Sequence, residues 1–191
     1  MPYSKAHKEN TRLNILESAQ SLFAEKGFDA VTVDVVMSNC SLTRGAFYAH
    51  FKSKSDLYSE ALKFSATHSE LGKTKPEAMS SKKWLGELLN AYLSLEHVNG
   101  ERPCPLAFLA TDIISRDKIT RKIYANTYIK MNKIILKYAG DDSPCNEDNI
   151  FSITSMIIGA VAISRTLEDN NLIKNILYSC RQQVRLMLGG I

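Results

Sequence analysis

The chain has 191 residues, of which 45% are hydrophobic and 23% charged, and its formal net charge is +4 at pH 7. This length and apolar content suffice for one large or two small domains and favour a two-domain soluble protein. The charge does not identify a nucleic-acid-binding protein, because residues 1–60 hold seven Lys or Arg and seven Asp or Glu. We expect no membrane contact, since the longest apolar stretch, at 153–163, is far shorter than the roughly 20 residues of a spanning helix.

The cysteines and the start of the chain bear on metal content and location. The four cysteines lie far apart, form no C-x-x-C pair and have no histidine at zinc-ligand spacing. This pattern argues against a structural metal, and we expect no cofactor. The first residues, MPYSKAHKENTR, are polar and contain no secretory signal. These features predict a protein of the reducing cytoplasm.

Two helices are expected first along the chain. One covers about 8–26, with apolar residues at helical spacing and Gly27 as its C-cap. The next is capped by Asp29 or Thr32. Its single apolar face is formed by Val33, Val36 and Met37.

A tight turn over 39–42 separates the second helix from a short third one, which Thr43 caps. The third is expected to bury Ala46, Phe47 and Phe51, whereas Arg44, Tyr48 and His50 are exposed. A turn of about four residues holds two helices at the steep angle that places the second in a DNA major groove. The segment therefore predicts a helix-turn-helix.

Specific residues of this segment resemble the N-terminal signature of the tetracycline-repressor (TetR) family of transcriptional regulators. They are Thr32-Val33, the run LTRGAFY at 42–48, the run HFKSK at 50–54, and Asp56-Leu57. The resemblance covers about 13–62 and implies a DNA-binding domain at 1–53 followed by a ligand-binding and dimerisation domain at 54–191. The chain departs from the pattern at Met37, where a small residue is usual, and at Ser41, where glycine is usual. Ser41 must therefore tolerate or avoid a positive φ.

The helix-turn-helix offers both kinds of DNA contact. Arg44 is the expected base reader, because a guanidinium can bridge guanine O6 and N7. Polar and basic side chains around it can hold phosphates, Gly45 and Ala46 leave room for the groove, and His50 suits either a groove edge or a helix-end hydrogen bond. The predicted DNA-binding residues are Thr32, Thr43, Arg44, Gly45, Ala46, Tyr48, His50, Lys52 and Lys54.

The rest of the chain also has helical patterning. A fourth helix is expected over about 54–67, as the link between the two domains, and the Gly- and Pro-containing segment 71–81 is a linker. Further helices are expected from about Trp84 to Asn99, from Pro105, and over about 117–138, 147–168 and 170–188. The prediction is thus an all-α protein of about nine helices, which is the number that the TetR resemblance implies.

The second domain is expected to hold a ligand and to dimerise. Aromatic and apolar residues of its middle helices, with Cys104, suggest the walls of a small-molecule chamber; they are Trp84, Leu88, Tyr92, Cys104, Phe108, Tyr124, Tyr128 and Met131. Apolar rows on the last two helices predict a homodimer surface or, alternatively, protomer core; they are Ile153, Ile157, Val161, Ile173, Leu177, Cys180 and Val184.

These features predict a cytoplasmic regulator, expected to be a repressor, that binds a palindromic operator in double-stranded DNA as a homodimer and is released by a small hydrophobic or aromatic effector. Two alternatives are a repressor that senses oxidants or electrophiles through Cys104 beside Arg102, and a DNA-binding protein that ignores ligands. An enzyme is not expected, because none of the four histidines forms a recognisable catalytic arrangement with Cys104.

Overall fold

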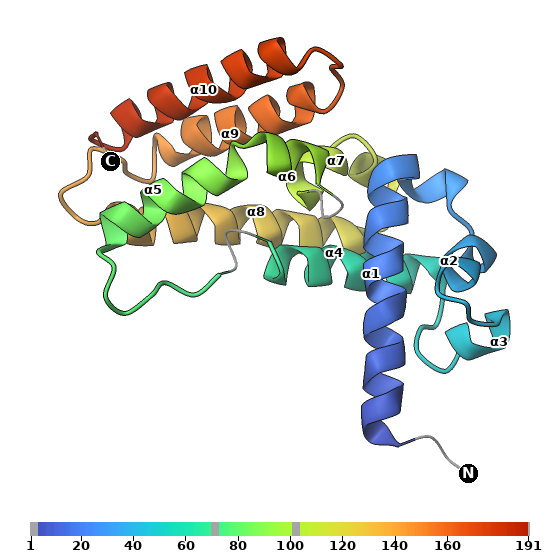
Figure 1. Ribbon diagram of the computed structural model, residues 1–191. Helices are drawn as coiled ribbons and strands as arrows, with labels where there is room; N and C mark the ends of the chain where they lie inside the picture. The colour runs from blue at the N-terminus through green and yellow to red at the C-terminus, as the bar shows by residue number, and fades with distance from the viewer. Residues whose placement is uncertain (1–3, 70–72, 101–103, 191) are drawn as a thin grey trace.

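The computed structural model describes residues 4–69, 73–100 and 104–190, and it confirms the predicted all-α class (Figure 1). These residues form ten α-helices and one short 3₁₀ helix, η2, and contain no strand. No helix in the described ranges combines the length and the apolar character that a membrane crossing demands.

The first three helices form a small head at one end of the molecule (Figure 1). They are α1 (Lys5–Ala30), α2 (Val33–Asn39) and α3 (Arg44–Phe47). Gly27 interrupts α1 with φ 74° and ψ 170°, which confirms its expected role as the end of the regular helix. The Thr32 hydroxyl accepts a hydrogen bond from the Val35 N–H and so caps α2.

The helix α4 (Lys54–Thr67) has the predicted bounds and connects the two parts of the molecule. It packs along α1 and, farther on, along α8 (Figure 1). Leu57, Tyr58 and Leu62 of α4 share one apolar core with α1, α2 and α3, and Ile113 of η2 (Ile113–Ser115) joins it. The cores therefore do not separate at residue 53, because α4 completes the head.

The second domain begins with α5 (Ser81–Tyr92), α6 (Leu95–Asn99) and α7 (Pro105–Phe108). One helix was expected from Trp84 to Asn99, but the chain breaks at Leu93 and the Ser94 hydroxyl caps α6. This break accounts for a helix more than the expected nine. After η2 the long helix α8 (Lys118–Ala139) lies within one residue of its predicted bounds.

The last two helices, α9 (Ile150–Ser164) and α10 (Asn170–Met187), pack side by side along the far edge of the second domain (Figure 1). The α9 helix is shorter than predicted at both ends: Asn146 and Asn149 side chains accept backbone N–H bonds in the turn before it, and the regular helix stops at Ser164. One face of each helix enters the core of the second domain, which includes Ile157 and Leu177.

Candidate nucleic-acid interface

The helix α3 has one buried and one exposed side, as predicted. Phe47 is fully buried and Phe51, just beyond the helix, is 2% exposed, so both belong to the core of the head. Tyr48, the neighbour of Phe47, is 60% exposed. Thr43 and Arg44 are also exposed at the start of the helix. The packing of two phenylalanines thus fixes the direction in which the polar side chains point.

The turn between α2 and α3 contains a positive φ at Ser41, where glycine would be usual. Ser41 has a φ of 56°, the only positive φ outside glycine in the described residues. The Leu42 N–H donates to the Met37 carbonyl at 2.8 Å, and the Ser41 N–H donates to Ser38 O at 3.0 Å. Serine in this conformation costs about 1–2 kcal/mol relative to glycine, so the turn is kept at some expense of stability.

Arg44, the expected base reader, is anchored but free to change partner. Its Nη1 lies 2.9 Å from Asp34 Oδ2 of α2, and both side chains are more than half exposed. Tyr48, the first cause, and Asp34 raise the pKa of the Arg44 guanidinium, which therefore stays charged. An exposed ion pair contributes at most about 1 kcal/mol, so a guanine can compete with Asp34.

The surface around Arg44 has room for a close neighbour. A Cβ added to Gly45 would come no nearer than 3.8 Å to any described atom, that of Thr43 Oγ1, so the fold itself would accept alanine. The Thr43 hydroxyl makes no capping bond within the described chain and is available to a phosphate. Gly45 thus leaves open space at the exposed start of α3, whereas Ala46 is half-buried against the core of the head.

His50 lies on a groove between the start of α1 and α3. The groove has a volume of about 380 Å³, and its walls include Lys8, Thr11, Ala46 and Ala49. Partial burial, followed by Lys8 and Arg12, lowers the pKa of His50, which is therefore neutral at pH 7. Its buried Nδ1 has no hydrogen-bond partner among the described residues. The helix-end hydrogen bond, one of the two roles expected for His50, is therefore not made by Nδ1.

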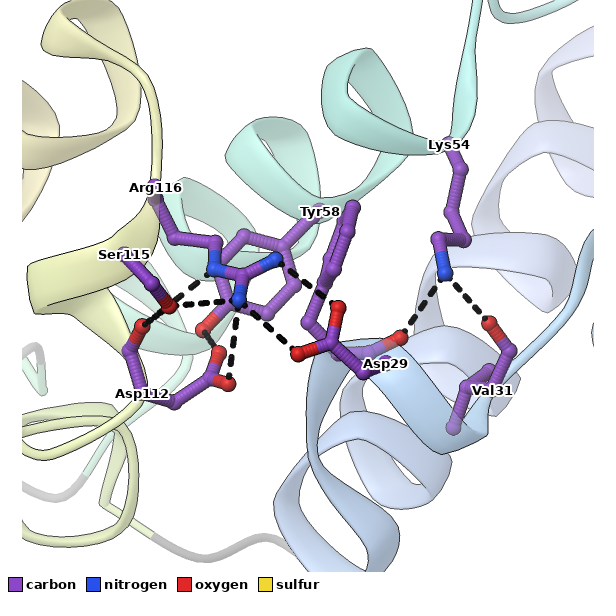
Figure 2. Close-up of polar contacts among 8 residues, drawn as sticks. Asp29, Val31, Lys54, Tyr58, Asp112, Ser115 and Arg116 are labelled. Atoms are coloured by element: carbon purple, nitrogen blue, oxygen red, sulfur yellow. Dashed lines mark hydrogen bonds and ion pairs between the residues drawn. The ribbon is translucent and has the colours of Figure 1, made fainter.

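The two lysines after α3 behave differently. Lys52 is exposed, as a phosphate ligand must be. Lys54 points inward instead: its Nζ donates to the Phe28 and Val31 carbonyls at 2.9 and 3.0 Å and lies 4.0 Å from the centre of the Phe28 ring (Figure 2). We therefore correct the predicted set by removing Lys54, because its ammonium group already satisfies the carbonyls at the end of α1.

A second polar cluster joins the head to the second domain (Figure 2). Arg116, after η2, donates to both carboxylate oxygens of Asp29 at 3.4 and 3.1 Å. Tyr58 of α4 donates to Asp112 Oδ2 at 2.5 Å, and Asp112 Oδ1 lies 3.8 Å from Arg116. Burial and Asp112 raise the pKa of Tyr58, which stays protonated. No local pattern predicts this cluster, because its contacts between the two parts join residues 54 and 87 positions apart.

The predicted ligand chamber is mostly packed core. Of its eight residues only Tyr92, Cys104 and Met131 line the interior cavity, whose volume is about 30 Å³. Leu88 is fully packed, Tyr124 and Tyr128 are tied to Leu106 O and Thr154 Oγ1, and Trp84 and Phe108 pack against the same core. The cavity walls that were missed come from the end of α4 and the residues just after it, from α7, and from the middle of α8; they are Ala66, Ser69, Pro105, Leu106, Thr127, Lys130 and Ile134.

Cys104 does not have the features of a reactive thiol. It is 4% exposed, and its sulfur lies 2.6 Å from the Tyr92 hydroxyl oxygen. Burial raises the pKa of the thiol, and hydrogen bonds from Tyr92 and from the backbone offset this only in part. Arg102, which was expected to lower that pKa, lies outside the described residues. At neutral pH the thiolate is therefore scarce, which weighs against oxidant sensing.

The apolar rows predicted as a dimer surface are instead protomer core. Ile153, Ile157, Val161, Ile173, Leu177 and Val184 are at most 2% exposed, and Cys180 is half-buried. The reason is that α9 and α10 use these rows against each other and against the second domain's core. Other large apolar side chains of the two helices are about half exposed or more; they are Phe151, Ile163, Leu172, Tyr178 and Leu186.

Known proteins resemble the head in sequence and the whole chain in fold. The model of a family described as bacterial regulatory proteins, tetR family, matches residues 15–61. The transposon Tn10 TetC protein of Escherichia coli is 42% identical over 55 residues, which are 29% of this chain and 28% of that protein. The icaADBC negative transcriptional regulator IcaR of Staphylococcus aureus is 35% identical over 49 residues, 26% of each chain.

The matched segment thus spans less than a third of these two relatives. A solved structure covers more: that of a TetR-family transcriptional regulator from Agrobacterium tumefaciens aligns with 92% of this chain and 98% of its own, with a TM-score of 0.74. Its sequence identity is 14%, so this likeness concerns the fold alone. The sequence match therefore lies in the head, and the second domain is related by architecture.

Proposed function

We propose that this chain, which belongs to the TetR family through its N-terminal domain, is a DNA-binding transcriptional regulator and not an enzyme. The observation that carries the proposal is the exposed surface formed by Thr43, Arg44, Gly45 and Tyr48 on a helix held by buried Phe47. Arg44 reads a base, while Thr32, Thr43, Tyr48 and Lys52 hold phosphates and set the register.

The protein acts on DNA as a homodimer in this proposal. The exposed apolar side chains of α9 and α10, among them Tyr178 and Leu186, form the contact with a second copy. A two-fold pair of heads reads half-sites about one helical turn apart, which makes the operator palindromic. Repression is the expected outcome, in line with the name of IcaR as a negative regulator. Such a protein works in the cytoplasm, where its DNA lies.

The operator is released when an effector occupies the second domain. The interior cavity lies between α4, which completes the core of the head, and α8. Its volume of about 30 Å³ holds about two waters, so an effector enters only if these helices separate. Arg116 and Asp112 then transmit the shift of α4 to Asp29 and the head. A hundredfold loss of operator affinity requires about 2.7 kcal/mol of coupling.

The test is a selection of genomic fragments by the purified full-length protein, followed by sedimentation of the protein with the recovered DNA. A palindromic consensus bound by two copies supports the proposal. Recovery of no fragment, or of fragments without a shared motif, would refute the regulator. A single copy on a full site would refute the dimer alone. The ligand-insensitive alternative predicts normal binding that no small molecule alters.

A further inference from the structure

Two hollows between α4 and α8 meet at the same three residues. The interior cavity and an open groove of about 210 Å³ on the outer surface are both lined by Ala66, Thr127 and Lys130. The two hollows therefore adjoin at these three side chains, and we call them the outer and inner parts of one path.

The outer part of the path is positively charged and rich in hydrogen-bond donors. Lys63 of α4 and Lys130 and Asn126 of α8 line the groove. The Lys63 Nζ forms an ion pair with Glu60 Oε1 at 2.6 Å, whereas Lys130 forms no ion pair with any described residue. The Asn126 amide also has no hydrogen-bond partner in the described ranges and is free to donate to a ligand.

The whole of α8 strengthens this charge. Its 22 residues contain six Lys or Arg and no Asp or Glu, and all six cations are exposed. The helix therefore carries more positive charge than the net +4 of the entire chain. Such a one-signed surface raises the local concentration of anions beside the groove.

The inner part of the path is neutral and mostly apolar. Leu106, Met131 and Ile134 line it, together with the paired Tyr92 and Cys104. Burial raises the pKa of both Tyr92 and Cys104, so neither carries a charge at neutral pH. No described acidic side chain lines this part, and a ligand cation would have no counter-charge there.

We propose that the effector is an amphipathic anion: a carboxylate whose charged group binds Lys130 and Lys63 at the groove and whose apolar body wedges α4 from α8 and extends toward Tyr92. This inference rests on the proposed effector response and names the chemical class of the effector. It replaces the expected hydrophobic or aromatic molecule without a specified charge. A charged group also explains how the ligand is oriented, with its apolar end inward.

The experiment measures binding of hexanoate, decanoate and dodecanoate, with the matched primary alcohols and amines, to the full-length protein by calorimetry without DNA. At least one carboxylate is expected to bind at least about tenfold more tightly than its alcohol, the usual effect of a charge-assisted hydrogen bond. Lys130→Met is expected to remove this advantage while leaving alcohol binding unchanged. The control is Lys133→Met, which removes an exposed α8 cation that lines neither hollow.

Each outcome decides one question. The anionic effector is overturned by any of three results: equal binding of carboxylates and alcohols, equal loss in both lysine variants, or no binding of any carboxylate. None of these results bears on operator binding, which is tested separately. The same ligands are next added to the complex with the selected DNA. Carboxylate binding that depends on Lys130 but leaves operator affinity unchanged supports the site and refutes the effector response of the proposed function.

Discussion

The head and the second domain place their candidate functional side chains differently relative to their cores. In the head, Arg44 of the four-residue helix α3 is exposed, as are Thr43 and Tyr48, which cap its two ends. In the second domain, Tyr92, Cys104 and Met131 face inward onto a cavity between helices. The head thus presents its polar side chains to the outside, whereas the second domain surrounds a small cavity of about 30 Å³.

Because of this difference, a substitution in the head can change binding without changing stability, whereas a substitution in the cavity wall of the second domain changes both. The exposed side chain of Arg44 can be changed without altering the core of the head, to which the buried Phe47 and Phe51 belong. A chamber residue such as Tyr92 is both wall and core. Substitutions in the head are therefore expected to divide cleanly into two classes, and those in the walls of the second domain's cavity are not.

The largest effect is expected for a neighbouring pair in the head. Phe47→Ala removes a fully buried ring and should lower the free energy of unfolding by about 3–5 kcal/mol. Tyr48→Ala, at a side chain 60% exposed, should leave that free energy within about 0.5 kcal/mol and weaken DNA binding instead. Urea unfolding and DNA titration of both variants check this. Similar losses of unfolding free energy in the two variants would show that Tyr48 belongs to the core and not to an independent binding surface.

The same contrast applies to the last two helices. Ile157→Ala, at a fully buried position, should destabilise the protomer by about 2–5 kcal/mol. Leu186→Ala, at a side chain 69% exposed, should leave protomer unfolding unchanged and raise the dimer dissociation constant about tenfold. Sedimentation across a range of concentrations measures the second effect. A Leu186→Ala dimer as tight as the original would place the interface on another face.

The connection between the two parts gives a smaller effect. Arg116→Met leaves the largely buried Asp112 carboxylate without its cation and should cost about 1–3 kcal/mol of unfolding free energy. Asp29→Asn is the control, because the Asp29 side chain is 82% exposed and its charge contributes at most about 1 kcal/mol. Thermal unfolding compares the two variants. Equal losses of unfolding free energy would mean that the exposed Arg116–Asp29 pair, and not the buried Arg116–Asp112 pair, stabilises the cluster.

The smallest effect concerns the turn. Ser41→Gly should raise the unfolding free energy by about 0.5–1 kcal/mol, because glycine avoids the strain of about 1–2 kcal/mol at the observed φ of 56° but loses more conformational entropy on folding. Ser38→Gly, at an exposed position inside α2, should lower it by about the same amount. Denaturant midpoints of both variants test the opposite signs. A destabilising Ser41→Gly would show that the serine side chain stabilises the turn.

The two regions also differ in how much of their structure is predictable from the sequence. The exposed Arg44 and Tyr48 and the buried Phe47 were predictable because they lie within one short segment, where local spacing determines which side chains are exposed. The inward turn of Lys54 was not, because its partners Phe28 and Val31 are 26 and 23 residues away. In the second domain, helical periodicity located apolar rows correctly but does not tell core from interface. The cavity between α4 and α8 is lined by residues far apart in the sequence, such as Ala66 and Lys130, so no local sequence pattern predicts it.

The most direct test compares affinities for the selected operator and for a scrambled duplex, with the original protein and Arg44→Ala, at two salt concentrations. The account predicts a strong preference for the operator, and a loss of about 1–3 kcal/mol of that preference in Arg44→Ala, with little change in binding to scrambled DNA. Equal affinity for both duplexes, falling steeply with salt, would mean phosphate attraction alone and would contradict sequence reading by the head.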